Sequence, residues 1–212
     1  MKRTPITDIW DFLTEPAWYT AVFWLLVVAS VAIAIAAWRR DPDQRQLTRV
    51  FDLSLRLVMG AMWWEQSLWK LPPYYTVSPS EPFGTTGLAF WMGRIADFAP
   101  FELQANFVKN VVLPNFYVFA PIVYLTEVAI AVSLMLGLLT RLGGFLGFLM
   151  AVNLWAGLYL APGEWPWAYG FLVVVQAVYT LHPTGHSLGL DALARVRSAP
   201  TVWWSRLIAV AG

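Results

Sequence analysis

The residues best placed to do chemistry in this chain are polar and charged groups set inside apolar stretches. Arg56, Gly60, Trp63, Ser67 and Lys70 follow one another at steps of 4, 3, 4 and 3 residues, so they share one stripe of a helix. Gly60 and Ser67 are small and allow a second helix to approach closely. In a bilayer, Arg56 and Lys70 either extend their side chains to the headgroups or, for Lys70, hold an anion near the outer face.

Glu127 is the second candidate, because no other charged residue lies in its apolar stretch. A carboxylate alone in lipid is so unfavourable that it takes up a proton or pairs with a cation of another helix. Lys70 and Arg56 are the candidate partners. Two roles remain open for Glu127: a structural ion pair, or a group that gives and takes protons beside a redox ligand. We expect Glu127 and Lys70 to be the catalytic residues.

Further polar groups lie where apolar segments end or run deep. Asn153 is in the middle of an apolar segment, where it either hydrogen-bonds another helix or contacts a ligand. Glu164 is followed by Trp165 and Trp167, which form an aromatic rim. Such a rim either anchors the chain at a membrane interface or borders the opening to a binding site.

Five long apolar segments must position these groups. They are residues 17–38, 50–71, 115–139, 142–161 and 167–181. A hydrocarbon core about 30 Å thick needs about 20 residues at about 1.5 Å rise per residue. Backbone polar groups in lipid must be satisfied within the segment, which favours helices. The sequence therefore predicts an all-α integral membrane protein with five spans.

The connection 72–114 is the longest part outside the predicted spans. Apolar residues recur in it at helical spacing, namely Leu88, Trp91, Met92 and Ile95, then Phe101, Ala105, Val108 and Val112. We expect short interfacial helices that cap the outer end of the bundle. Arg94 lies within this cap.

Composition excludes several kinds of cofactor. The chain has 58% hydrophobic residues, no cysteine and two histidines, His182 and His186, both beyond the last predicted span. Disulfides, thiolate zinc sites, iron–sulfur clusters and covalently attached haem are excluded, and we expect neither a buried haem nor a metal. The basic residues form membrane-flanking clusters and not a soluble stripe, so we expect no nucleic-acid partner.

The basic residues also predict the orientation. Arg39, Arg40, Arg45, Arg49, Arg141, Arg195, Arg197 and Arg206 lie on one side of the predicted spans, whereas Lys2, Arg3, Lys70, Arg94 and Lys109 lie on the other. By the positive-inside rule, the N-terminus is outside and the C-terminus is in the cytoplasm. Acidic residues and a long apolar stretch follow the first residues, so we expect a retained anchor helix and not a cleaved signal.

Several motifs together resemble the DoxX superfamily of small membrane proteins. They are Arg56-x3-Gly60-x6-Ser67-x2-Lys70, Glu127, and Leu134-Met-Leu-Gly137-Leu-Leu-Thr140-Arg141. Others are similar to the DoxD branch, namely Leu113-Pro114-Asn115-Phe116, Asn153-Leu154-Trp155, Glu164-Trp165-Pro166-Trp167 and Ser187-Leu188-Gly189-Leu190-Asp191. Ser67 replaces the usual glycine, and His186 stands where the family commonly has arginine.

The resemblance implies a four-helix core at residues 50–195 with the outer cap 72–114. An N-terminal lead-in, anchor helix and basic loop (1–49) would precede it, and a C-terminal tail (196–212) would follow it. DoxD is the membrane subunit of thiosulfate:quinone oxidoreductase (TQO) in the prokaryotic cytoplasmic membrane. It works with an outer subunit, DoxA, in oxidising thiosulfate to tetrathionate and reducing membrane quinone.

These expectations assign quinone, as substrate or bound ligand, to a site among the helices. The expected substrate- and quinone-binding residues are Arg56, Trp63, Arg94, Asn153, Glu164, Trp165 and Trp167. In this hypothesis the outer loop presents the sulfur donor and Glu127 manages protons. The alternative is a non-catalytic accessory subunit of a larger respiratory or photosynthetic complex, because the sequence offers no redox centre of its own.

Overall fold

The fold is entirely helical over the residues that the structure describes. The computed structural model describes residues 4–197 and residue 212, and contains no strand in these residues. The helices are α1 (Pro5–Thr14), α2 (Trp18–Arg40), α3 (Leu47–Leu68), α4 (Gly87–Phe98), α5 (Glu102–Phe107), α6 (Phe116–Leu136), α7 (Thr140–Gly157), α8 (Pro166–Leu181) and α9 (Leu190–Arg197). The all-α prediction is confirmed. The predicted tail 196–212 lies outside the described residues, apart from the end of α9 and residue 212.

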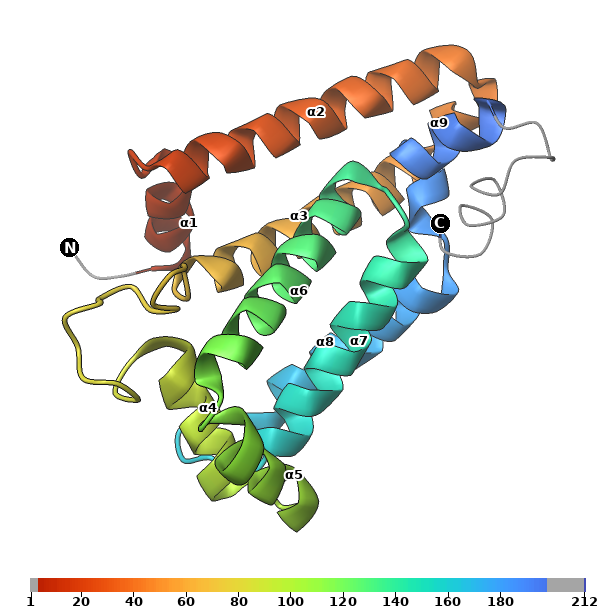
Figure 1. The fold of residues 1–212 in the computed structure, drawn as a ribbon. Coiled ribbons are helices and arrows are strands. Elements are labelled where there is room, and N and C mark those ends of the chain that lie inside the picture. Colours follow the sequence, from red (N-terminus) through yellow and green to blue (C-terminus); the bar gives the residue numbers. More distant parts are fainter. Residues whose placement is uncertain (1–3, 198–211) are drawn as a thin grey trace.

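Four helices pack in a row that closes only part of a bundle. α3 packs against α6, α6 against α7, and α7 against α8, with the α7–α8 contact the most extensive. α2 lies outside this row, where it contacts α6, α3 and α9 (Figure 1). α1 folds back onto α2, where the Phe12 and Phe23 rings lie 4.9 Å apart. α3 packs mainly on α6, and α8 packs mainly on α7.

The five predicted spans correspond to α2, α3, α6, α7 and α8, but they differ in their fitness to cross a membrane. By length and composition, two of the described helices qualify, α2 with 23 residues and α6 with 21. These two favour membrane association. α3 has 22 residues but carries Arg49, Asp52, Arg56 and Glu65, and α8 has only 16 residues. Helices therefore occupy all five predicted segments, and two of the described helices have the length and composition of a membrane span.

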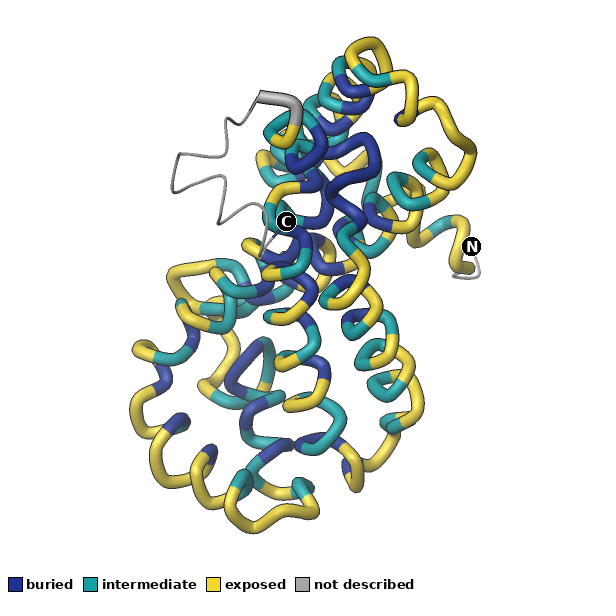
Figure 2. Tube along the Cα trace, turned by 90° about the vertical axis from the view of Figure 1, so that its right-hand side faces the viewer, coloured by how far each residue is buried: buried dark blue, intermediate teal, exposed yellow. Residues whose placement is uncertain are grey.

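The polar stripe of α3 turns into the bundle, as the sequence predicts. Arg56, Gly60, Trp63 and Ser67 are buried, and Lys70 just beyond α3 is buried as well. A Cβ atom on Gly60 would lie 2.6 Å from Met135 Cγ and 3.0 Å from the Ala131 carbonyl oxygen. Only glycine therefore permits this approach of α3 to α6. Buried residues recur on the inward faces of the helices in Figure 2, with exposed ones on the outward faces.

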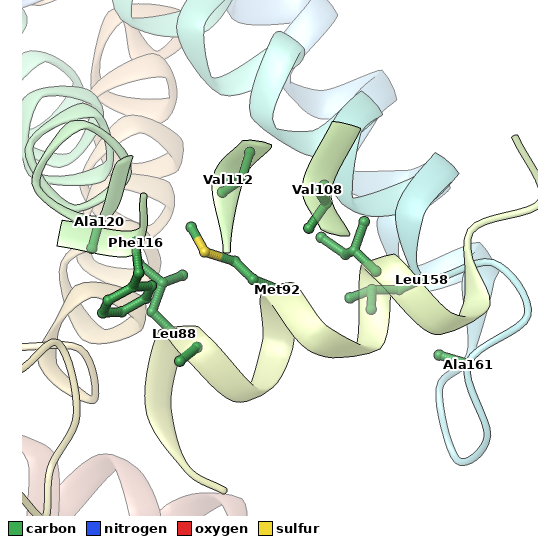
Figure 3. Close-up of a cluster of buried hydrophobic side chains, with 10 residues drawn as sticks. Leu88, Met92, Val108, Val112, Phe116, Ala120, Leu158 and Ala161 are labelled. Carbon is green, nitrogen blue, oxygen red and sulfur yellow. The ribbon is translucent and has the colours of Figure 1, made fainter. Parts of the chain in front are cut away.

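A cap of short helices covers one end of the bundle. It consists of α4, α5, a π-helical turn (Val108–Val112) and the start of α6. Leu88 and Met92 of α4 point toward Val112 and Phe116, and this cluster also contains Leu158 after α7 (Figure 3). Short helices are therefore present in the connection 72–114, whereas their position at an outer membrane interface stays a prediction.

The opposite end is held by hydrogen bonds to the segment that follows α8. The fully buried Arg56 donates from Nη1 to the carbonyl oxygens of Thr184 at 2.6 Å and Ser187 at 3.1 Å. Gly137, with φ of 66°, ends α6 so close to Arg56 that an added Cβ would lie 2.7 Å from Arg56 Cζ. Helix α3, the end of α6 and the segment after α8 thus meet at the Arg56 guanidinium group.

Asp191 holds the same end from another side. Its Oδ1 atom accepts from the Leu139 N–H at 2.9 Å, and its Oδ2 atom accepts from the Thr140 N–H at 3.3 Å. Burial raises the pKa of Asp191, while these N–H groups lower it by favouring the carboxylate. Asp191 therefore stabilises the sharp turn between α6 and α7, where Leu139 also has a positive φ of 50°.

This arrangement predicts a difference between two glycines that share a left-handed conformation. Gly137 and Gly163 have φ of 66° and 82°, but nothing lies within 4 Å of a Cβ built on Gly163. Gly163→Ala should lower the free energy of unfolding by about 1–2 kcal/mol, because alanine is strained in a left-handed backbone conformation. Gly137→Ala should cost about 1–3 kcal/mol more, because its methyl group displaces Arg56. Equal thermal unfolding midpoints of the two purified variants in detergent would contradict the role given to Gly137.

Candidate functional site

A large cavity lies between the helices beneath the cap. Its volume is about 680 Å³, and it is bordered by α3, α6, α7 and α8 with α4 above. Its lining is mainly aromatic and apolar. The lining residues are Met59, Met62, Trp63, Gln66, Trp69, Lys70, Leu88, Trp91, Met92, Ile95, Val123, Glu127, Met150, Asn153, Leu154, Leu158, Glu164, Trp165, Ala168, Tyr169 and Leu172. A volume of this size suits an organic ring system with part of a tail, since small-molecule sites span about 300–1,000 Å³.

A buried ion pair lies in the cavity wall. Lys70 Nζ donates to Glu127 Oε1, and the two residues are 4% and 3% exposed. Glu127 therefore pairs with Lys70 and not with Arg56, the other candidate partner. The Lys70 ammonium also lies 4.2 Å from the centre of the Trp69 ring. The pair is neutral as a unit, which lowers the cost of its burial in an apolar wall.

Two polar atoms in the cavity wall are left without a protein partner. Trp63 Nε1 and Glu127 Oε2 are both buried, and neither has a hydrogen-bond partner among the described residues. Buried polar groups are nearly always hydrogen-bonded, so an unpartnered donor and an unpartnered acceptor on one cavity indicate a ligand or ordered water. The residues that line the cavity thus include one N–H donor and one carboxyl oxygen without a partner in the described part of the chain.

The mouth of the cavity is formed by the connection between α7 and α8. Glu164 Oε2 accepts a hydrogen bond from the Tyr169 hydroxyl at 2.6 Å, and Trp165 is 61% exposed. Asn153 Oδ1 accepts from Gln104 Nε2 at 2.9 Å, so Asn153 joins α7 to α5 of the cap. Glu164, Trp165 and Asn153 all line the cavity, together with the buried pair.

Three other residues assigned to the site lie outside the cavity lining. Arg56 is held at the far end of the bundle by carbonyl oxygens. Arg94 donates to the Pro162 carbonyl oxygen and lies 5.2 Å from the centre of the Phe98 ring. Trp167 is largely exposed at the start of α8. Backbone carbonyl oxygens thus hold one nitrogen of each guanidinium group away from the cavity, while Arg56 Nε, Arg56 Nη2 and Arg94 Nε have no hydrogen-bond partner in the described residues.

Sequence reasoning missed part of the lining. Met59, Trp63, Gln66 and Lys70 lie at steps of 4, 3 and 4 residues, the same helical spacing that revealed the stripe. Following this row would have found Met59 and Gln66. The contribution of Tyr169 has no such signal, because it depends on the turn between α7 and α8. Over the described residues, no group of three or more His, Cys, Asp or Glu side chains could hold a metal ion.

The site favours an uncharged ligand with a polar ring. Its one buried cation, Lys70, is already neutralised by Glu127 within the described lining. A free dianion there would lose its hydration without a compensating charge. A ring with carbonyl or hydroxyl oxygens can instead accept from Trp63 Nε1 and exchange a proton with the Glu127 carboxyl group.

The pair predicts a compensating double substitution. Lys70→Met or Glu127→Gln alone leaves a buried charge without its partner, which typically costs about 3–5 kcal/mol. Lys70→Met combined with Glu127→Gln removes both charges and should recover most of that loss. We expect the double variant to unfold at a higher temperature than either single variant in the same detergent. Additive losses would mean that the two side chains do not stabilise each other.

Comparison with known proteins agrees with the resemblance of the motifs. The family model described as "TQO small subunit DoxD" matches residues 51–210. Searches of curated proteins and of solved structures find no match to this chain. The matched region contains the stripe of α3, the Lys70–Glu127 pair and the whole cavity lining. Because this match covers well over half of the sequence, the chain belongs to the DoxD family.

Proposed function

We propose that this chain is the membrane subunit of a thiosulfate:quinone oxidoreductase and binds the quinone in the cavity beneath the cap. One observation carries the proposal: Trp63 and Glu127, which line an apolar cavity of about 680 Å³, each have a buried polar atom without a partner in the described residues, Nε1 and Oε2. A quinone ring has two carbonyl oxygens on an apolar frame, which matches this combination. Family membership supports the same ligand.

In the proposed reaction, two thiosulfate ions each lose one electron and join through a new sulfur–sulfur bond to give tetrathionate. The quinone takes up those two electrons and two protons and becomes the quinol. Trp63 Nε1 holds one ring oxygen by a hydrogen bond. Both protons come from water: the Glu127 carboxylate takes up a proton and passes it to the reduced ring, and Lys70 stabilises the carboxylate before and after each transfer.

The sulfur donor is oxidised outside the cavity in this proposal. Thiosulfate is a dianion, and the cation of the cavity wall is already paired with Glu127. Transfer of such an ion into the apolar lining would be strongly unfavourable. We therefore assign the donor to the outer face of the cap, at a contact with a DoxA-type partner, from which electrons pass to the bound quinone.

The quinone is proposed to enter sideways from the lipid. α3 and α8 both border the cavity, and Met62 and Trp165 of its lining are 55% and 61% exposed. A lipid-soluble ring could pass between them while its tail stays in the bilayer. Methionine is flexible and adapts to such passage.

The finer membrane arrangement belongs to the same proposal. α2, α3, α6, α7 and α8 serve as five spans, with the cap and the N-terminus outside and the C-terminus in the cytoplasm. Residues 1–49 form the anchor unit, 50–195 the DoxD-like four-helix domain and 196–212 the tail. Arg56 and Ser67 of α3 are buried in the bundle, which makes these two polar residues tolerable in a span.

Two neighbouring tryptophans provide a matched test. Trp63 and Trp64 are both buried, and both Nε1 atoms lack a partner in the described part of the chain, but only Trp63 lines the cavity. Trp63→Phe should raise the KM for quinone about 2- to 10-fold in thiosulfate-dependent quinone reduction by the purified complex, since one hydrogen bond contributes about 0.5–1.5 kcal/mol. Trp64→Phe should leave the KM unchanged. Equal effects of both substitutions would remove Trp63 from the site.

The paired variant separates stability from proton transfer. Lys70→Met with Glu127→Gln keeps the wall neutral and packed but removes the titrating group. We expect the complex to assemble, to bind quinone and to lose at least about 100-fold in kcat, the lower range for general acid–base catalysis. Full activity of an assembled double variant would leave Glu127 a structural role only. Absence of thiosulfate-dependent turnover in the unaltered complex would favour the accessory-subunit alternative.

A further inference from the structure

A group of basic side chains gathers at the end of the bundle opposite the cap. Arg49 of α3 donates from Nη1 to Ser187 Oγ at 3.1 Å, and Arg141 of α7 donates from Nε to the Thr180 carbonyl oxygen at 3.1 Å. Arg195 of α9 is exposed beside them. Within residues 4–197, no carboxylate lies within 4 Å of these three guanidinium groups. We call Arg49, Arg141, Arg195 and His186 the basic end site.

His186 is held at the centre of this site without a partner for its ring. It is 8% exposed, and its Nε2 atom has no hydrogen-bond partner in the described residues. Arg49 Nε is also buried and unpartnered there. Gln44 fixes the backbone on both sides, donating to the His186 carbonyl oxygen at 3.2 Å and accepting from the Leu188 N–H at 2.8 Å. The loop that carries His186 is therefore fixed beside Arg49 of α3.

The carboxylates nearest to the site are already engaged. Asp52 Oδ2 accepts from Ser187 Oγ at 2.6 Å and lies 3.6 Å from the exposed His182 ring. Asp191 accepts from backbone N–H groups at the α6–α7 turn. Burial, with the positive charges of Arg195, Arg49 and Arg141, lowers the pKa of His186 to about 4. The ring is then neutral near pH 7, and the excess positive charge faces outward.

Exposed apolar side chains lie at the helix ends that carry this site. Leu47 begins α3, Leu142 follows Arg141 in α7, and Leu181 ends α8, and all three are exposed. Cations beside exposed leucines match a lipid, whose phosphate is anionic and whose chains are apolar. Inorganic phosphate is also anionic, but it has no acyl chains that could contact the leucines.

We infer that the basic end site binds the phosphodiester of an anionic phospholipid headgroup. Arg49 Nε and the His186 ring donate to its oxygens, while Arg141 and Arg195 supply the attraction. Leu47, Leu142 and Leu181 contact its acyl chains. The site lies at the other end of the bundle from the cavity, so its occupancy is independent of quinone binding, although it rests on the chain being in a membrane.

The test uses the purified complex in detergent with one of three additives: phosphatidylglycerol, phosphatidylcholine or inorganic phosphate. We expect phosphatidylglycerol to raise the thermal midpoint saturably and to remain bound in native mass spectra. Phosphatidylcholine and phosphate at equal concentration should have little effect. Stabilisation by phosphate equal to that by phosphatidylglycerol would overturn the lipid assignment.

Two double variants that remove the same charge test whether phosphatidylglycerol binds at the basic end site. Arg49→Gln with Arg195→Gln should weaken phosphatidylglycerol binding at least about tenfold, since each basic residue near an anionic surface contributes about 1 kcal/mol. Arg39→Gln with Arg40→Gln removes the same charge from the end of α2 and should leave binding unchanged. Equal losses in both pairs would mean non-specific attraction and would refute the site.

Substitution of His186 gives a second measure that does not depend on net charge. His186→Gln keeps an N–H donor and should retain binding, whereas His186→Leu should weaken it. Equal binding by the two variants would refute the role of the ring. These readouts do not need turnover, so a complex that fails to reduce quinone can still bind the lipid as inferred.

Discussion

The cost of placing charge inside an apolar bundle governs both ends of this molecule. The chain meets it in two ways. At the capped end, Lys70 and Glu127 neutralise each other in the cavity wall. At the other end, Arg56 donates from Nη1 to the carbonyl oxygens of Thr184 and Ser187. The first solution leaves a carboxyl oxygen free for a ligand, whereas the second uses the charge to fasten the backbone.

These two solutions give the ends different mechanical properties. Around Arg56 the backbone has little freedom, because Gly137 and Gly189 lie so close to the guanidinium group that neither could carry a side chain unchanged. Around the cavity, Met59, Met62 and Met150 belong to the lining and can adjust to an occupant. A rigid end opposite an adaptable one suits a bundle that must hold its helices in register while a bulky ring enters and leaves.

Helical spacing in the sequence was sufficient to find the elements and the inward face of α3, because burial in a bundle repeats with the helix. The pairing of Glu127 with Lys70 was predictable for a different reason: a lone carboxylate in an apolar segment needs a cation. Spacing could not reveal what satisfies Arg56 or Arg94. Their acceptors are carbonyl oxygens of Thr184, Ser187 and Pro162, which any residue type can supply. Partners of that kind leave no mark in a sequence, so both cations were assigned to the site.

The neutral wall also bears on how the work is divided between subunits. A free cation in the cavity would attract small anions and would compete with a quinone for the same space. Pairing Lys70 with Glu127 removes that attraction but retains a group able to exchange protons. In the proposed function, proton chemistry and anion chemistry are thereby kept apart: the membrane chain binds the lipid-soluble acceptor, and the charged donor stays in water with a partner. On this argument the membrane chain needs no redox centre of its own, provided that the partner releases electrons within reach of the cavity mouth at Glu164 and Trp165.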